Sequence, residues 1–530
     1  MRIPVTLYLV ALVVRLVVAA GFPEPAYPDS AYYVQVAREL AAGHGFSVDF
    51  VWIFPEVGGG IPADAGLPVP SNAHWLPLAS IVQVPFIWAL GPTMLASLIP
   101  TALLGALMAP IAWFIAKDAG MRPLVGVAAG LLAAIPLLST AYMSQPENFS
   151  LFGPLVAGSL LFAARGLRGD SRALVLAGLL AGLAAVSRTE GWLVLGGILI
   201  AWWWAWIRRR ATTPLVAALG AGLAFVLVVT PWYLRQLSVF GSISPSTATG
   251  KVLYLRDFSE WNSITTPATL DWLLGMGLGP LLATRLEGLG IALGLFAVLV
   301  MGVVLVPFLV VGAWTRRREV GFGPGYLYAL FLLGFCTVLT PIHVPGGQFM
   351  HSVVGLAPLA YVLAMDGAVV VAGWLARRLQ ARRPERLATT LVGALVVVGV
   401  VSAAFSVVTV QGSWNRQADT LRAAARGLDA AGAAATDRVM SMDAAGIRYW
   451  AGRPGVVLVN DPIEIAEAVA RAYEIRWLVL DHADSVPLAK AVLADQRPAW
   501  VGPIAWDDGE VAVYPVCTEP GDGRCAGPST

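Results

Sequence analysis

The sequence predicts a polytopic α-helical membrane protein with about eleven transmembrane helices, amphipathic helices beside the membrane and a C-terminal extracytoplasmic α/β domain. Hydrophobic residues make up 57% of the 530 residues, and charged residues only 13%. Soluble proteins carry about 25% charged residues, so most of this chain is predicted to lie in lipid, in agreement with its mean hydropathy of +0.72. The composition changes near residue 411, and this change predicts the outer domain.

Long apolar runs give the positions of the predicted spans. A helix needs about 20 mostly apolar residues to cross a bilayer. A further apolar stretch, 76–90, is short and is followed by Gly91 and Pro92, so we expect it to lie beside the membrane or to insert only partly. The runs that we interpret as spans lie near residues 6–21, 93–116, 124–141, 148–164, 173–187, 191–207, 214–233, 288–314, 323–341, 352–375 and 388–410.

Basic clusters predict which side of the membrane each loop faces. If 76–90 does not cross, five clusters fall on the same side as the N-terminus, and the positive-inside rule makes that side cytoplasmic. The first outer loop, 22–75, and the region after residue 411 then lie outside the cell. The clusters are Lys117 with Arg122; Arg165, Arg168 and Arg172; Arg208 to Arg210; Arg316 to Arg318; and Arg377, Arg378, Arg382, Arg383 and Arg386.

The region 411–516 has the pattern of an α/β domain. Apolar strands in RVMSMD, GVVLVN and RWLVLDH alternate with helical segments, and a terminal hairpin is predicted through Trp506 and Tyr514. We expect a small parallel or mixed sheet that is covered by helices. The sequence has no glycine-rich phosphate loop after the first strand and no basic surface for nucleic acid. Cys517 and Cys525 lie on the outer side, where they could pair.

Asp29 is the leading candidate for a catalytic residue. It follows the first apolar run and heads an amphipathic helix, within Pro28 to Phe46, that is too short and polar to span. A lone acid fixed at a membrane surface indicates an active site at the interface. The simpler interpretation makes Asp29 a helix N-cap, with Gly43 at the other end. Both interpretations can hold, because a capping carboxylate is also held in a fixed orientation.

Ionisable residues at or within spans are unfavourable unless they have a function, so three more side chains stand out. Glu147 lies at the outer end of a span, where the alternative is a first-turn helix acid after Pro146. Arg188 and Glu190 lie at a tight turn between two short spans, and a local ion pair is the simpler interpretation.

Four residues in outer segments are further candidates. Lys251 and Arg256 lie five apart in the loop 234–287, where the alternative is an exposed, solvated surface. His351 ends the Pro/Gly-rich turn 341–351, where it can hydrogen-bond a phosphate or simply cap a helix. His74 ends the first outer loop, and a lone histidine is more often structural than catalytic.

The order of several motifs resembles a known family. The chain resembles the GT-C superfamily of membrane glycosyltransferases, which includes the protein O-mannosyltransferases and the aminoarabinose transferase of lipid A. The likeness covers roughly residues 1–410, as a transmembrane catalytic domain, and 411–530 resembles the outer domains of such enzymes. The motifs, after one apolar span, are Asp29, Tyr33, Ala37, Leu40, Gly43, Gly45 and Phe46; Pro146 with Glu147; SRTEGW at 187–192; and PWYLRQLSVFG at 231–241.

The resemblance implies a polyprenyl-phosphate sugar donor, used on the outer face of the membrane, and a glycan, lipid or protein acceptor. Asp29 is then the catalytic acid of the first outer loop, and Glu147 is the second acid. Ser30 follows Asp29 where the best-known relatives have a second acid, which weakens the case for a metal; no cofactor is expected, and a divalent metal is possible but has no support in the sequence. The remaining candidates, with roles in acceptor binding or structure, are Tyr33, His74, Arg188 and Glu190.

The residues support this chemistry without the family. An acceptor hydroxyl needs a base, and partial desolvation raises the pKa of a carboxylate toward the working range. Lys251, Arg256 and His351 can stabilise the leaving lipid phosphate in place of a metal. We therefore predict transfer of one sugar with inversion. The rivals are a flippase for a lipid-linked sugar, for which no repeated halves are found, and a surface protein that acts through residues 411–530.

Overall fold

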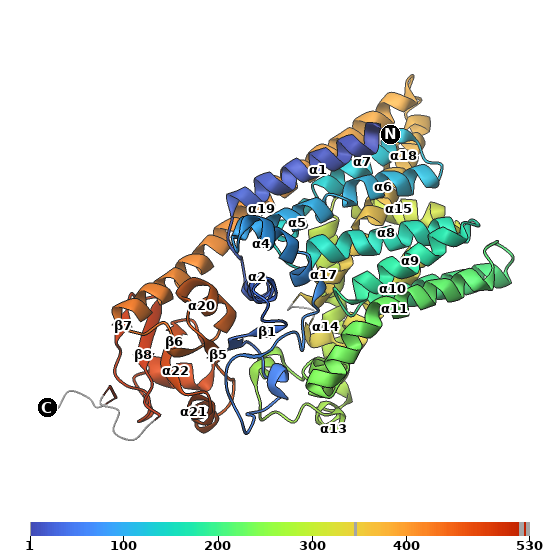
Figure 1. The fold of residues 1–530 in the computed structure, drawn as a ribbon. Helices are drawn as coiled ribbons and strands as arrows, with labels where there is room; N and C mark the ends of the chain where they lie inside the picture. The colour runs from blue at the N-terminus through green and yellow to red at the C-terminus, as the bar shows by residue number, and fades with distance from the viewer. Residues whose placement is uncertain (1, 344–346, 519–523, 526–530) are drawn as a thin grey trace. The chain divides into compact units, whose positions relative to one another are not determined.

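The computed structural model describes residues 2–343, 347–518 and 524–525. It confirms the predicted fold class, with many apolar helices and a C-terminal sheet (Figure 1). The chain forms two compact units, each built from three segments. We call Met1–Pro23, Leu76–Trp232 and Leu282–Gln411 the helical unit, and Glu24–Trp75, Tyr233–Leu281 and Gly412–Thr530 the sheet unit. The predicted independent domain at 411–530 stays a prediction.

Eight segments of the described chain are long and apolar enough to cross a membrane, and four shorter apolar helices accompany them. The count of eleven spans is therefore not confirmed. The stretch 76–90 forms α3 (Leu78–Ile81) and α4 (Val84–Leu90), which together are one of these shorter apolar segments, and its position beside the membrane stays a prediction. The helices are α1 (Arg2–Gly21), α3 (Leu78–Ile81), α4 (Val84–Leu90), α5 (Met94–Gly105), α6 (Met108–Asp118), α7 (Pro123–Ala134), α8 (Phe149–Leu167), α9 (Ser171–Ala185), α10 (Gly191–Ile207), α11 (Leu215–Phe240), α14 (Leu278–Leu295), α15 (Val306–Arg316), α16 (Gly323–Gly334), α17 (Gln348–Val353), α18 (Ala357–Arg378) and α19 (Pro384–Ala430).

Two predicted boundaries differ from the structure. The run 288–314 is not one helix, because Gly302 and Val303 adopt left-handed backbone angles between the segment that begins with α14 and the start of α15. The helix predicted over 388–410 does not end where the polar residues begin. It is part of α19, which continues to Ala430 as one helix of 47 residues. Its polar half contains five alanines and three arginines and no proline, so helix propensity carries it past the end of the apolar run.

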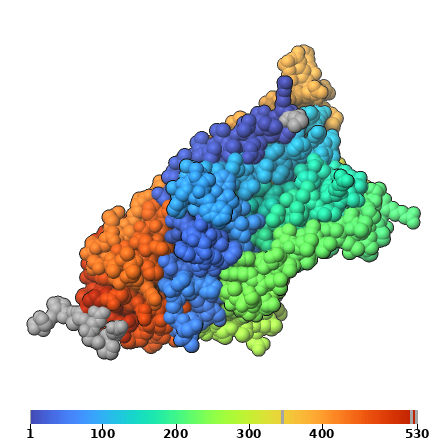
Figure 2. Space-filling model, viewed as in Figure 1, coloured from blue at the N-terminus to red at the C-terminus, as the bar shows by residue number. Residues whose placement is uncertain are grey.

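Small residues allow the helices of the helical unit to approach closely. A Cβ on Gly312 of α15 would meet the backbone oxygen of Leu363, and one on Gly367 of α18 would meet that of Phe308. Such contacts replace the hydrophobic effect as the source of helix association in lipid. Helix α1 leaves one face at the surface (Figure 2) and buries Arg15, whose Nη1 donates to the carbonyl oxygen of Met143 at 2.8 Å.

The sheet unit contains the mixed sheet that the sequence predicts. The strand order is β2 (Phe50–Val51), β5 (Gly455–Val457), β4 (Arg438–Ser441), β6 (Ile475–Asp481), β8 (Val511–Pro515) and β7 (Trp506–Asp507), with the first four strands parallel. The terminal hairpin through Trp506 and Tyr514 is confirmed. Three short helices, α20 (Ala444–Ala451), α21 (Ile463–Ala472) and α22 (Pro487–Leu493), follow β4, β5 and β6. Cys517 and Cys525 form a disulfide.

The edge strand β2 comes from residues 22–75, the predicted first outer loop. The sequence does not predict a strand there. Phe50 pairs with Gly455, so the loop completes the sheet of the C-terminal region. Two side-chain contacts hold the same junction: Arg448 Nε lies 2.8 Å from Asp49 Oδ1, and the Tyr449 hydroxyl donates to Glu24 at 2.7 Å. The first loop is therefore part of the sheet unit rather than a free segment.

Candidate functional site

Asp29 lies in the first turn of α2 (Pro28–Ala41) and is half-buried. The N-cap of this helix is Tyr27, in an extended conformation, so the interpretation of Asp29 as the cap is wrong. Pro28 occupies the first helical position. A backbone N–H at this position has no partner within the helix, so proline, which lacks the N–H, loses no hydrogen bond there. A carboxylate in the first turn still interacts favourably with the helix dipole. Gly43 follows the helix with a φ of 86°, as its predicted role at the helix end requires.

A buried polar network joins α2 to the rest of the first loop. The Tyr32 hydroxyl donates to Glu56 Oε1, and the backbone N–H of Asn72 donates to Tyr32 at 2.6 Å and to Glu56 at 3.2 Å. Tyr32 and the neighbouring Tyr33 are wholly buried, and Glu56 is only 2% exposed. Burial raises the pKa of Glu56 to about 8, despite the hydrogen bonds that favour its ionised form.

Glu56 is not among the residues that the sequence pattern singles out. It sits in the short 3₁₀ helix Phe54–Val57, inside the run VWIFPEV, which is otherwise apolar. A single acid in such a run is the signal that indicates a buried carboxyl group, because acids are rarely buried without a partner. Its partners lie elsewhere in the chain and give no signal of their own.

Helix α11 adds two polar side chains to the same network. Arg235 donates to the carbonyl oxygens of Ser71 at 2.9 Å and of Phe46 at 3.2 Å. Gln236 donates to the carbonyl oxygen of Asn72 at 2.7 Å. The motif PWYLRQ therefore fixes the backbone of the first loop through two donors that the sequence analysis did not single out.

Aromatic side chains surround His74. Trp52 and Trp75 stack with their ring centroids 3.6 Å apart, and Trp261 meets the His74 ring edge-on at 5.0 Å. His74 Nδ1 also lies 2.8 Å from the hydroxyl of Ser246. The histidine thus has a hydrogen-bond partner and packs among aromatic rings, as a structural role requires.

A cavity of about 690 Å³ lies within the sheet unit, beside this network. Two carboxyl groups line it, those of Glu56 and Asp64, together with the hydroxyl-bearing residues Ser242, Thr249 and Tyr473. No lysine, arginine or histidine is among the described residues that line it. Such a lining suits hydroxyl-rich ligands better than phosphates.

Lys251 and Arg256 both bond to carbonyl oxygens of their own loop. Lys251 is 3% exposed and its Nζ donates to the carbonyl oxygen of Ser263, and burial lowers its pKa. Arg256 donates to the carbonyl oxygen of Trp272 and lies over the Trp272 ring, 3.8 Å from the centroid. Neither side chain belongs to a freely solvated surface, and their predicted contact with a phosphate stays a prediction.

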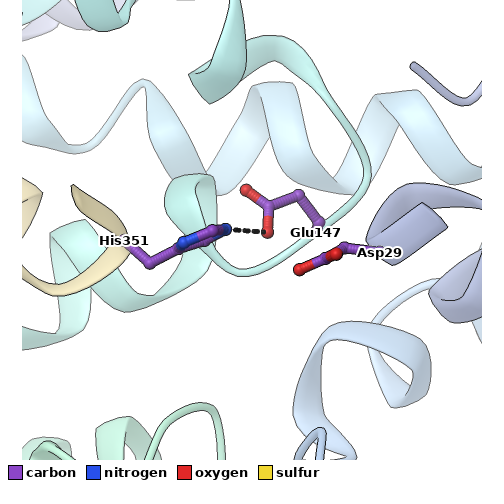
Figure 3. Close-up of side chains that lie close together, drawn as sticks. All are labelled: Asp29, Glu147 and His351. Atoms are coloured by element: carbon purple, nitrogen blue, oxygen red, sulfur yellow. Dashed lines mark ion pairs between the residues drawn. The ribbon is translucent and has the colours of Figure 1, made fainter. Parts of the chain in front are cut away.

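Glu147 and His351 form an ion pair within the helical unit (Figure 3). Glu147 Oε2 lies 3.2 Å from His351 Nε2, while His351 Nδ1 lies 2.7 Å from the carbonyl oxygen of Gly347. The imidazole also stacks on Phe149, whose N–H donates to Glu147 Oε1 at 3.2 Å. The pair is buried, and these contacts hold both side chains in one orientation.

Arg188 and Glu190 form the local ion pair that the sequence predicts, with Arg188 Nη2 3.1 Å from Glu190 Oε1. Arg188 Nε also donates to the hydroxyl of Ser352, one residue after His351, at 3.1 Å. Ser187 in turn donates to Asn148, one residue after Glu147, at 3.0 Å. The turn 187–190 is thus hydrogen-bonded to both chain segments that carry the Glu147–His351 pair.

Solved structures share this fold. The chain is similar to ArnT from Cupriavidus metallidurans bound to undecaprenyl phosphate, at 14% identity over 96% of this chain and 97% of that chain, with a TM-score of 0.57. It is also similar to the apo state of the same ArnT, at 14% identity over 97% and 98% of the two chains, with a TM-score of 0.54. No protein-family model and no curated protein matches the sequence. The predicted resemblance to GT-C membrane glycosyltransferases is confirmed as a likeness of fold, and the chain is a multi-pass membrane protein.

Proposed function

We propose that this protein is an inverting glycosyltransferase, which moves one sugar from a polyprenyl-phosphate donor to an acceptor hydroxyl on the outer face of the membrane. The fold likeness to ArnT carries this proposal, because it extends over 96% of the chain and one of the ArnT structures holds undecaprenyl phosphate. A flippase for a lipid-linked sugar remains the alternative, and the buried network around Glu56 gives it no support.

Asp29 acts as the general base in this proposal. It removes the proton of the acceptor hydroxyl as the oxygen attacks the anomeric carbon of the sugar, and the bond from that carbon to the phosphate breaks on the opposite face. The half-buried position of Asp29 in the first turn of α2 gives the carboxylate a fixed direction. Positioned bases of this kind typically contribute a factor of about 10² to 10⁴ in rate.

The departing phosphate needs positive charge, which Lys251, Arg256 and His351 would supply. For His351, the pair with Glu147 supports this role, because the carboxylate 3.2 Å from Nε2 holds the imidazole in one orientation. Glu147 then acts as the second acid by holding the imidazole, rather than by touching the sugar. The roles of Tyr33, Arg188 and Glu190 are structural in this scheme, since all three pack or pair locally.

The cavity of about 690 Å³ in the sheet unit is our proposed place for a part of the acceptor away from the reacting hydroxyl, because Asp29 is not among the residues that line it. Carboxylates and hydroxyl groups accept hydrogen bonds from sugar hydroxyls, and the lack of cations among the described lining residues disfavours phosphates. We therefore expect the acceptor to present an uncharged hydroxyl-rich group, such as part of a cell-envelope glycan.

The test incubates the purified protein with radiolabelled polyprenyl-phosphate sugars and a mixture of envelope glycans. Transfer of label, or slow hydrolysis of the donor, supports the enzyme, and both should fall in an Asp29→Asn variant. An Asp49→Asn variant is the control, since it removes an acid from the same loop that pairs with Arg448 at the sheet edge. Scrambling of the donor across liposomes without any transfer or hydrolysis would favour the flippase instead.

A further inference from the structure

A second cavity of the sheet unit, of about 320 Å³, is lined by none of the residues used above. It lies where β4 ends at Ser441 and β6 ends at Asp481. Strand β4 pairs with β5 on one side and with β6 on the other, so the strand order reverses between β4 and β6. In open α/β sheets, ligands bind outside the carboxyl ends of the strands at such a point.

Three aspartates line this cavity: Asp443, Asp481 and Asp484. Each gives one oxygen to a backbone N–H, those of Gly446, Ala483 and Asp481 respectively, at 2.7 to 2.9 Å. No lysine, arginine or histidine of the described chain pairs with any of the three, and the adjacent His482 pairs with Asp507 instead. No basic residue is among the described lining residues. The cavity therefore gathers negative charge without a compensating cation of its own.

Ser441 gives an independent sign of a missing ligand. Its side chain is 4% exposed and lines the cavity, yet its hydroxyl has no hydrogen-bond partner among the described residues. A buried hydroxyl without a partner is unfavourable, and most such groups in native proteins are satisfied. A ligand in the cavity that offers a donor or an acceptor would satisfy it.

The titration of the aspartates agrees with a site for a cation. Burial raises the pKa of Asp443 to about 6. Burial also raises the pKa of Asp484 to about 6, and the charge of Asp481 adds to that rise. At neutral pH Asp443 and Asp484 are ionised, but at a cost that a bound cation would remove.

The shape of the cavity distinguishes an organic cation from a metal ion. The three carboxylates of the described chain do not bring three ligand oxygens within 4.8 Å of one another, as binding of one metal ion would require. Apolar side chains, including Leu421, Ile447 and Val479, line the space with them. Methylene groups fit such a lining, whereas a hydrated metal ion does not.

We infer that this cavity binds a small aliphatic diamine, with one ammonium group on Asp443 and the other on Asp481 and Asp484. The methylene chain lies along Leu421, Ile447 and Val479, and an ammonium hydrogen reaches the hydroxyl of Ser441. Binding at this site is separate from sugar transfer, so its test does not depend on the proposed reaction.

The experiment measures binding to the purified full chain by titration calorimetry. The probe is 1,4-diaminobutane, and the comparisons are 1-aminobutane, 1,4-butanediol and magnesium chloride. We expect saturable binding of the diamine, weaker binding of the monoamine and no binding of the diol. Absence of saturable diamine binding, or equal binding of the diol, overturns the inference, and tight binding of magnesium alone assigns the site to a metal.

Variants locate the binding in this cavity. Asp443→Asn with Asp484→Asn keeps both backbone hydrogen bonds but removes two charges, and should weaken diamine binding roughly tenfold to a hundredfold. Asp495→Asn is the matched control, because this carboxylate is 89% exposed in the same unit and outside the cavity. Ser441→Ala should weaken binding about threefold to tenfold without lowering the melting temperature. Unchanged affinity in the double variant would disprove the assignment even if that variant folds normally.

Discussion

Replacing Glu56 by glutamine should remove a pH dependence of stability that the buried network creates. The glutamine has the same shape as the protonated acid, and its amide oxygen can accept the same bonds from Tyr32 and the Asn72 N–H. Burial raises the pKa of Glu56, and Tyr32, Trp52, Asn72 and Arg235 only partly offset that rise. Below about pH 4.5, where Glu56 is protonated in both the folded and the unfolded chain, the wild type should therefore be about as stable as the variant.

The sign and the size of this pH effect on stability follow from the linkage between proton binding and folding. The folded pKa of Glu56, about 8, lies above its ordinary value of 4.5, so the folded protein keeps a proton that the unfolded chain releases. This stabilisation is complete below pH 4.5 and is lost as the pH rises through about 8. At about 1.4 kcal/mol for each pH unit between these values, the loss is on the order of 5 kcal/mol.

The assay is thermal unfolding of the detergent-solubilised protein at a series of pH values that runs from below 4.5 to above 8. The wild type should lose melting temperature between about pH 4.5 and 8 and Glu56→Gln should lose much less, so that the variant is the more stable protein in this range and its advantage stops growing above about pH 8. Glu510→Gln, at an exposed position, controls for the change in net charge. Parallel curves for wild type and Glu56→Gln would refute the buried, protonated state of Glu56.

Three further predictions concern catalysis, donor binding and topology. Asp29→Asn should preserve folding and lower sugar transfer by a factor of about 10² to 10⁴, measured as initial rate; near-normal turnover would leave Asp29 a purely structural first-turn acid. Lys251→Ala with Arg256→Ala should weaken binding of the donor by roughly tenfold to a hundredfold and leave acceptor binding unchanged; equal donor affinity would remove both from the site. A reporter fused at Gly412 should be active outside the cell and one at Arg317 inside, and the reverse at either position would overturn the predicted orientation.

Local pattern determined much of the fold. The apolar run 191–207 became α10 with the same bounds, and the hairpin through Trp506 and Tyr514 formed where turn and strand residues alternate. The Arg188–Glu190 pair was also predictable, because two residues on one tight turn meet without help from the rest of the chain. Periodicity and spacing are local properties, and these elements depend on little else.

The local sequence pattern predicted the wrong helix boundary where the residues at the boundary were compatible with two structures. The change to polar residues near 410 predicts a domain boundary followed by a separate helix in RQADTLRAAARGLDAAG, yet one helix, α19, runs through both to Ala430. The run 288–314 looked like one span, yet the chain turns at Gly302 and Val303. In both cases the composition of a window gave the wrong boundary, because hydropathy averages over residues whereas a helix ends at individual backbone angles.

The sequence by itself determined that the chain is a membrane protein with a C-terminal sheet, and it singled out Glu147 and His351 as unusual residues. Only the tertiary structure decided that these two pair, that β2 of the first loop joins β5, and that Glu56 is buried beneath Tyr32. A buried polar group must be satisfied by whatever group the fold brings opposite it. Packing between distant segments determines which group becomes that partner. The partner therefore cannot be predicted from the residues on either side of the polar group.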